Sequence, residues 1–127
     1  FSSLYDLYDI DLCLSGHDHF YSRTDTMYAG EVTENEGTVY VQSSSASGSN
    51  YDPLPETTAS FTVSAFDVRV PTYTAFTFTD DTIIGRTYRT DTDEIIDSFE
   101  ITDNTTDSDV NLFTAIFFFF KTLFSMI

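Results

Sequence analysis

Basic residues and cysteines are scarce in this sequence. Only 5 lysines and arginines stand against 21 aspartates and glutamates in 127 residues, so the formal net charge is -16. Because phosphate-rich partners are held by Lys and Arg, this balance argues against nucleic acid and an anionic membrane surface as partners. The single cysteine, Cys13, excludes an intramolecular disulfide and a thiolate metal cluster. Its place in IDLCLSG predicts that Cys13 is buried and packs as a small hydrophobic residue.

The start of the chain lacks the pattern of a secretory signal. The sequence begins with Phe1, and no basic segment, apolar core and cleavage site follow. The first residues, FSSLYDLYDIDL, are typical of a helix end that runs straight into a strand, and a domain rarely begins there. We therefore expect a processed chain or the C-terminal part of a longer protein.

Apolar and aromatic residues are plentiful enough for a folded domain. They make up 41% and 17% of the chain, which suffices for the core of one small domain. The abundant Thr, Tyr, Phe and Val favour strands. Periodicity predicts one or two helical turns within Ser2–Asp9. Apolar alternation predicts strands at Ile10–Gly16, Thr38–Ser45, within residues 59–70, and at Thr72–Thr79, Thr82–Thr90 and Glu94–Ile101.

The last three of these strands predict an antiparallel meander with one apolar and one threonine-rich face. Two stretches rich in polar and turn residues, 21–37 and 45–58, are predicted to be loops. After Ile101 the composition changes, and we divide the chain into a domain over 1–101, an acidic polar linker over 102–111 and an apolar tail over 112–127.

The apolar tail is shorter than the ~20 residues that a membrane-spanning helix needs. Three interpretations are open: an anchor signal, a tail helix, or a non-native end from a truncated or frame-shifted gene. The run FFFF follows neither helical nor strand alternation, which favours the last interpretation. Any membrane contact is expected only through residues 112–127.

The chain has two histidines, His17 and His19, and they stand one residue apart in LSGHDHFYSRT. Side chains two apart on a strand share a face, so both imidazoles can reach one metal ion or two adjacent ions. Imidazole binds zinc, iron and other transition metals. Gly16 lets the backbone turn close to a ligand, and Asp18 can orient an imidazole.

The segment YDIDLCLSGHDHFYSRT resembles the last metal-binding motif of calcineurin-like metallophosphoesterases, above all the purple acid phosphatase-like branch. In that family a hydrophobic strand runs into GHxH, commonly followed by Tyr and Arg. The matching residues here are Gly16, His17, His19, Tyr21 and Arg23. GTVYVQSSSASGSNY is similar to the next strand and its Ser/Gly-rich loop, and the resemblance covers residues 1–101.

The resemblance implies an α+β, mostly β fold, namely the C-terminal part of a two-sheet sandwich with flanking helices and antiparallel strands at its end. It implies two metal ions (Fe, Zn or Mn), with His17 as a ligand of the second and His19 of the first. The ions would activate water for attack on a small phosphoester substrate. It also implies an exported protein.

The sequence lacks the family's earlier motifs, which are Asp-x-His or Asp-x-Gly, Gly-Asp-x-x, Gly-Asn-His and a further lone His. Two histidines cannot complete a dinuclear centre, so we expect the chain alone to be inactive. The alternatives are a non-catalytic exported β-rich binding or surface module, or a degenerate gene remnant. For Arg23 the sequence predicts an ion pair with a nearby acid such as Asp25, and a bidentate phosphate contact is the alternative.

Overall fold

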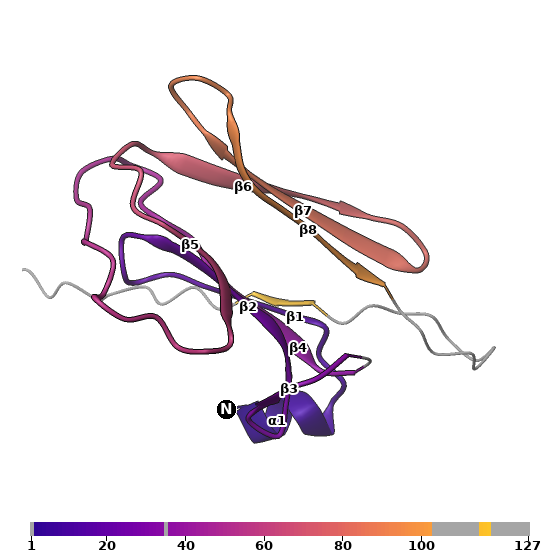
Figure 1. Ribbon diagram of the computed structural model, residues 1–127. Helices are drawn as coiled ribbons and strands as arrows, with labels where there is room; N and C mark the ends of the chain where they lie inside the picture. Colours follow the sequence, from indigo (N-terminus) through magenta and orange to yellow (C-terminus); the bar gives the residue numbers. More distant parts are fainter. Residues whose placement is uncertain (1, 35, 103–114, 118–127) are drawn as a thin grey trace, which may run out of the picture.

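The residues that the structure describes form two facing β-sheets and one short helix. The computed structural model describes residues 2–34, 36–102 and 115–117 (Figure 1). Within these residues strands predominate, and the helix α1 spans only Ser2–Leu7. Figure 1 shows the smaller sheet lying over the larger one, as in a sandwich. The expected mostly β fold is therefore confirmed.

The larger sheet is mixed and has six strands in the order β3-β2-β4-β1-β9, with β5 paired to β2. β1 runs parallel to β4 and to β9, whereas β2 runs antiparallel to β3, β4 and β5. The strands span Leu12–Ser15 (β1), Tyr21–Tyr28 (β2), Glu31–Val32 (β3), Thr38–Gln42 (β4), Thr62–Phe66 (β5) and Ala115–Phe117 (β9).

The smaller sheet is the predicted antiparallel meander. It contains β6 (Thr72–Phe78), β7 (Thr82–Arg89) and β8 (Ile95–Thr102), in that order. The prediction that threonines gather on one polar face is wrong, because Thr72 and Thr87 are 4% and 1% exposed. The hydroxyl oxygens of Thr74 and Thr87 lie 2.9 Å apart, so the two hydroxyls satisfy each other by a hydrogen bond.

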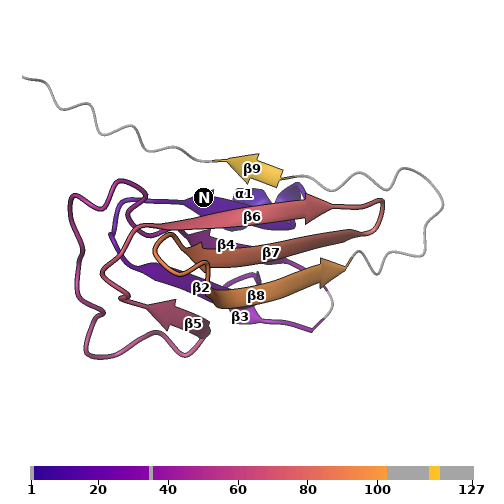
Figure 2. The same cartoon turned by 90° about the horizontal axis from the view of Figure 1, so that it is seen from above.

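The hydrophobic core fills the space between the two sheets, which Figure 2 shows stacked face to face. Gly85 on β7 makes room for this packing, since a Cβ there would lie 2.4 Å from the ring of Phe99. The fully buried or nearly buried core residues are Leu12, Tyr21, Val39, Val41 and Ile83.

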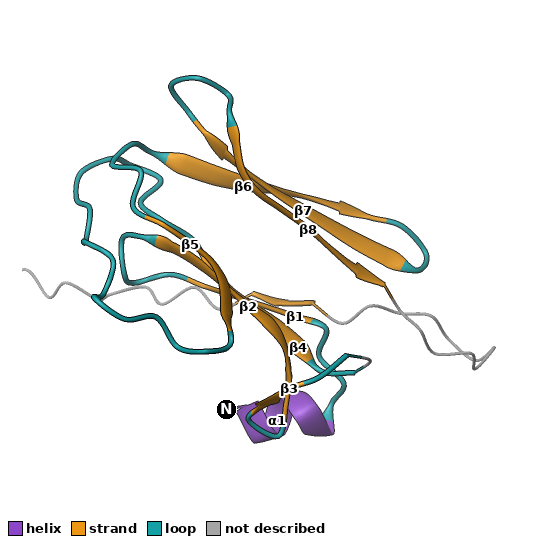
Figure 3. Ribbon diagram, viewed as in Figure 1, coloured by secondary structure: helices purple, strands orange, loops and turns teal. Residues whose placement is uncertain are grey.

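Helix α1 covers part of the other face of the larger sheet, so that this sheet lies between the helix and the smaller sheet (Figure 3). Tyr5 anchors the helix by packing on Tyr40 of β4, with 5.9 Å between the ring centroids. Cys13 lies in the same cluster and is a buried free thiol, as the sequence predicted. Burial raises the pKa of the Cys13 thiol and raises the pKa of Tyr5 to about 12.

The predicted loop over 21–37 is wrong for its first part, which forms β2 and β3. The hairpin turns at Ala29 and Gly30, both with positive φ, as a two-residue turn that joins twisted strands requires. Asn-Gly or Asp-Gly would have signalled this turn, whereas Ala-Gly is a weak signal. The other predicted strands are present, with ends shifted by up to a few residues.

The linker and tail were predicted over 102–111 and 112–127. Residues 115–117 of the tail form β9 beside β1, and residues 103–114 and 118–127 lie outside the described part of the chain. Within the described ranges no helix is long and apolar enough to cross a membrane.

Candidate metal centre

Residues 16–20, called the histidine loop from here on, connect the end of β1 to the start of β2. Because β1 and β4 are parallel, this loop emerges at the same edge of the sheet as the long loop over 43–61 that follows β4. The Ser43 N–H donates to the Ser15 carbonyl at 2.9 Å, so the two chains still run together where the strands end. Ligands commonly bind at the carboxyl edge of parallel strands, which makes this edge the candidate site.

The two histidines lie in a bend and not on a strand. The side-chain alternation of a strand, which we expected to direct both imidazoles to one face, therefore does not apply to them. His17 has φ 135° and a side chain that is 73% exposed. Its Nδ1 lies 3.4 Å from Oδ1 of Asp18, the residue predicted to orient an imidazole. His19 is half-buried, and its Nδ1 is buried without a hydrogen-bond partner among the described residues.

Glycine 16 was predicted to supply the backbone freedom of this turn. Its own φ is not in the left-handed region, and a Cβ at Gly16 would meet nothing within 4 Å. The unusual backbone conformation falls instead on His17, where an L side chain is strained. A strained residue at a candidate ligand position is a common mark of functional sites.

The loop over 43–61 holds His19 through its backbone. The His19 N–H donates to Oδ2 of Asp52 at 3.1 Å, and the Ser44 hydroxyl donates to the His19 carbonyl oxygen at 3.3 Å. Sequence reasoning missed Asp52, because nothing in a polar loop signals a contact with a residue 33 positions away. It missed Gln42 as well, whose Nε2 at the end of β4 is buried and has no hydrogen-bond partner within the described part of the chain.

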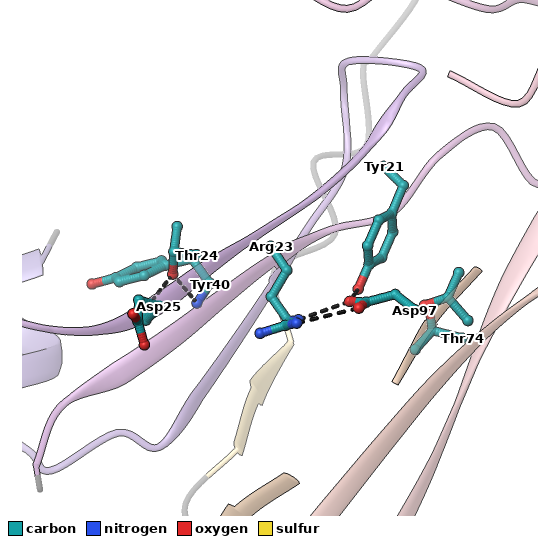
Figure 4. Close-up of polar contacts among 8 residues, drawn as sticks. Tyr21, Arg23, Thr24, Asp25, Tyr40, Thr74 and Asp97 are labelled. Carbon is teal, nitrogen blue, oxygen red and sulfur yellow. Dashed lines mark hydrogen bonds and ion pairs between the residues drawn. The ribbon is translucent and has the colours of Figure 1, made fainter. Parts of the chain in front are cut away.

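Tyr21 and Arg23 were predicted to support the histidine loop, and the structure places them at the junction of the two sheets. Both point to Asp97 on β8 (Figure 4). The Tyr21 hydroxyl donates to Asp97 Oδ2 at 2.6 Å. Arg23 Nε donates to the same oxygen at 2.7 Å and Nη2 donates to Oδ1 at 3.2 Å. The predicted ion pair of Arg23 with an acid is therefore present, but the acid is Asp97 on β8 and not the neighbouring Asp25.

This cluster of Tyr21, Arg23 and Asp97, called the inter-sheet clamp from here on, is shielded from solvent. The side chains of Arg23 and Asp97 are 16% and 9% exposed, and the guanidinium lies 4.7 Å from the centre of the Phe99 ring. Burial alone would raise the pKa of Asp97, but the hydrogen bonds from Arg23 and Tyr21 and the Arg23 charge outweigh burial and lower it. Burial and the bond to Asp97 raise the pKa of Tyr21.

The residues present can supply only part of a metal centre. Among the described residues no group of three or more His, Cys, Asp and Glu side chains is placed to hold a metal ion. His17 and His19 would contribute two imidazole ligands, whereas zinc sites use three or four protein ligands. The orphaned Nδ1 of His19 and the exposed ring of His17 are compatible with ligation that needs further groups.

A separate cavity of about 380 Å³ lies on the helix side of the larger sheet. Its lining includes Asp6, Met27, Tyr40 and Phe61 and contains neither histidine. The candidate metal centre and the cavity are therefore different features of the molecule.

Asp97→Ala should lower the free energy of unfolding by about 3–5 kcal/mol, because it leaves the buried guanidinium and phenol without their partner. The control is Asp91→Ala, which breaks the bidentate pair of Arg89 and Asp91 on the solvent-exposed turn. Urea unfolding at pH 7 should show a large shift for the first variant and little for the second. Equal shifts would contradict the account of the clamp.

The clamp should also make stability depend on pH. Asp97 has a lowered pKa in the folded chain, so its contribution is complete above its ordinary pKa of about 3.9. The contribution is lost as the pH falls from about 4 through the lower folded pKa. Urea midpoints measured from pH 7 to pH 2 should therefore fall less steeply below pH 4 for Asp97→Asn than for the unchanged chain. Parallel curves would rule out this role of Asp97.

His17→Gly and His17→Ala remove the same imidazole, but only glycine relieves the positive φ. We expect the glycine variant to be more stable than the alanine variant by about 1 kcal/mol. Gly16→Ala, in open space next to it, should change stability by less than about 1 kcal/mol. Thermal melts of the three variants measure both effects. An alanine variant as stable as the glycine variant would show that residue 17 is unstrained.

Comparisons with known proteins support the fold. No protein-family model matches the sequence, and no curated protein matches it. Among solved structures the chain is similar to a purple acid phosphatase isolated from yellow lupin (Lupinus luteus) seeds, with a TM-score of 0.66 and 18% sequence identity. The likeness covers 80% of this chain and 19% of that chain. The described fold is thus similar to a part of the lupin enzyme, and this chain spans about a fifth of that enzyme's length.

Proposed function

We propose that this chain is part of a dinuclear-metal phosphohydrolase that acts on phosphomonoesters or similar small phosphoesters. One observation carries the proposal. The sequence GHDH stands at the carboxyl edge of the parallel strands β1 and β4, in a fold similar to part of a purple acid phosphatase. This edge is where the chemistry of such sheets is usually located.

In this proposal His17 ligates the second metal ion and His19 the first, while the ions lower the pKa of water and shield phosphate charge. The side chain of His17 is 73% exposed, and Asp18 Oδ1, 3.4 Å from Nδ1 of His17, can accept a hydrogen bond from an Nδ1–H group. That contact would fix the tautomer that leaves Nε2 for the metal. The half-buried His19 is held by its backbone, which limits the positions its ring can take.

The remaining ligands would come from residues outside this sequence, so the chain alone is proposed to bind metal weakly and not to turn over substrate. Its acidity suits cation binding, because a net charge of -16 raises the local concentration of cations. Export of the complete protein, and the choice among iron, zinc and manganese, are parts of the same proposal.

The test uses the fact that the chain has only two histidines. In a chain labelled with ¹⁵N-histidine, added Zn²⁺ should shift the ring signals of His17 and His19, and no other imidazole complicates the spectrum. The variant His17→Ala with His19→Ala should bind Zn²⁺ at least ~10-fold more weakly in calorimetry. The loss follows because carboxylates spread over a surface hold zinc less tightly than positioned imidazoles.

Two controls make this result specific. Asp80→Asn with Asp81→Asn removes two negative charges from the turn between β6 and β7 and should leave Zn²⁺ affinity unchanged. Hydrolysis of an aryl phosphate by a longer gene product should be lost in the double histidine variant. Zinc affinity that follows the acidic turn and ignores the histidines would refute the proposal and favour a non-catalytic acidic β module.

A further inference from the structure

Asp52 is placed where it can control the geometry of His19. It follows Tyr51 in the loop over 43–61, and its Oδ2 accepts the His19 N–H at 3.1 Å. From the same loop the Ser44 hydroxyl donates to the His19 carbonyl oxygen at 3.3 Å. The two peptide groups that flank the His19 Cα are thus held on either side by one neighbouring loop. The ring is left out of both hydrogen bonds.

These two hydrogen bonds matter because the residues next to His19 in the histidine loop do little to fix its conformation. A Cβ added at Gly16 would meet nothing within 4 Å, and His17 adopts a positive φ that an L residue occupies only when its surroundings enforce it. A bond from a charged carboxylate to a main-chain N–H is stronger than one between neutral groups. Asp52 therefore supplies the strongest of the constraints that these contacts place on His19.

The sequence around Asp52 prepares it for this role. Pro53 follows directly, and the residue before a proline is restricted to extended conformations. Asp52 consequently loses little backbone entropy when its carboxylate reaches the histidine loop. Its Oδ2 accepts the His19 N–H, so this oxygen acts on the backbone of His19.

From this geometry we infer that Asp52 is a positioning residue, whose carboxylate fixes the backbone of His19 so that the imidazole is oriented for a metal ion. The inference rests on the proposed function and names a residue that the GHDH motif does not include. Its effect should appear in the affinity for a metal ion and in the signal of the His19 ring, because the hydrogen bond holds the backbone of His19.

The experiment measures Zn²⁺ affinity by calorimetry for the 127-residue chain and three variants. Asp52→Ala removes the acceptor, and affinity should fall ~10-fold. Asp52→Asn keeps an amide oxygen that can accept the same N–H, and affinity should return to within about twofold of the unchanged chain. Glu56→Ala removes an exposed carboxylate from the same loop and controls for charge, so affinity should stay unchanged.

Two further readouts separate positioning from general stability. The thermal midpoint should hardly change in Asp52→Ala, while the His19 amide should exchange with solvent faster and the His19 ring signal should shift without metal. If Asp52→Ala binds Zn²⁺ as the unchanged chain does, the positioning role is overturned and the proposed function stands. If Asp52→Asn binds Zn²⁺ as weakly as Asp52→Ala, the charge of Asp52 and not its hydrogen bond determines the affinity. That result also overturns the positioning role. If the unchanged chain shows no histidine-dependent Zn²⁺ binding, both proposals fall.

Discussion

The carboxylate of Asp97 accepts hydrogen bonds from Tyr21 and Arg23, and the relation of the two sheets depends on this contact. The partners are 76 and 74 residues apart in the chain, Tyr21 is fully buried, and the side chains of Arg23 and Asp97 are 16% and 9% exposed. An uncompensated charge in such a place would cost several kcal/mol, so the three groups are stable only together. The position of β8 over β2 follows from this requirement.

The clamp also fixes one end of the histidine loop. Tyr21 is the first residue of β2 and stands two residues after His19, while Ser15 at the other end belongs to the ladder between β1 and β4. The loop is therefore held at both ends by strands, and Asp52 holds it at a third point by accepting the His19 N–H. Strain at His17 is the expected cost of holding five residues between such fixed ends.

Much of this fold follows from local pattern. The strands of the smaller sheet could be predicted because apolar alternation and acidic turns are visible within each segment. β2 could not, because its interior side carries Arg23, whose polar character is explained only by Asp97 far along the chain. For the same reason Asp52 could not be assigned to the candidate site from the sequence, whereas the paired histidines could. Contacts between distant polar residues are what the local pattern does not encode.

The central claim is that the end of β1 presents His17 and His19 to metal ions. The most direct measurement is anomalous diffraction at the zinc absorption edge from crystals of the chain soaked in Zn²⁺. The account predicts anomalous density at the carboxyl edge of β1 and β4, at about 2.0–2.1 Å from an imidazole nitrogen of each histidine. Density only at acidic turns such as the one at Asp80, with both imidazoles free of zinc, would contradict it.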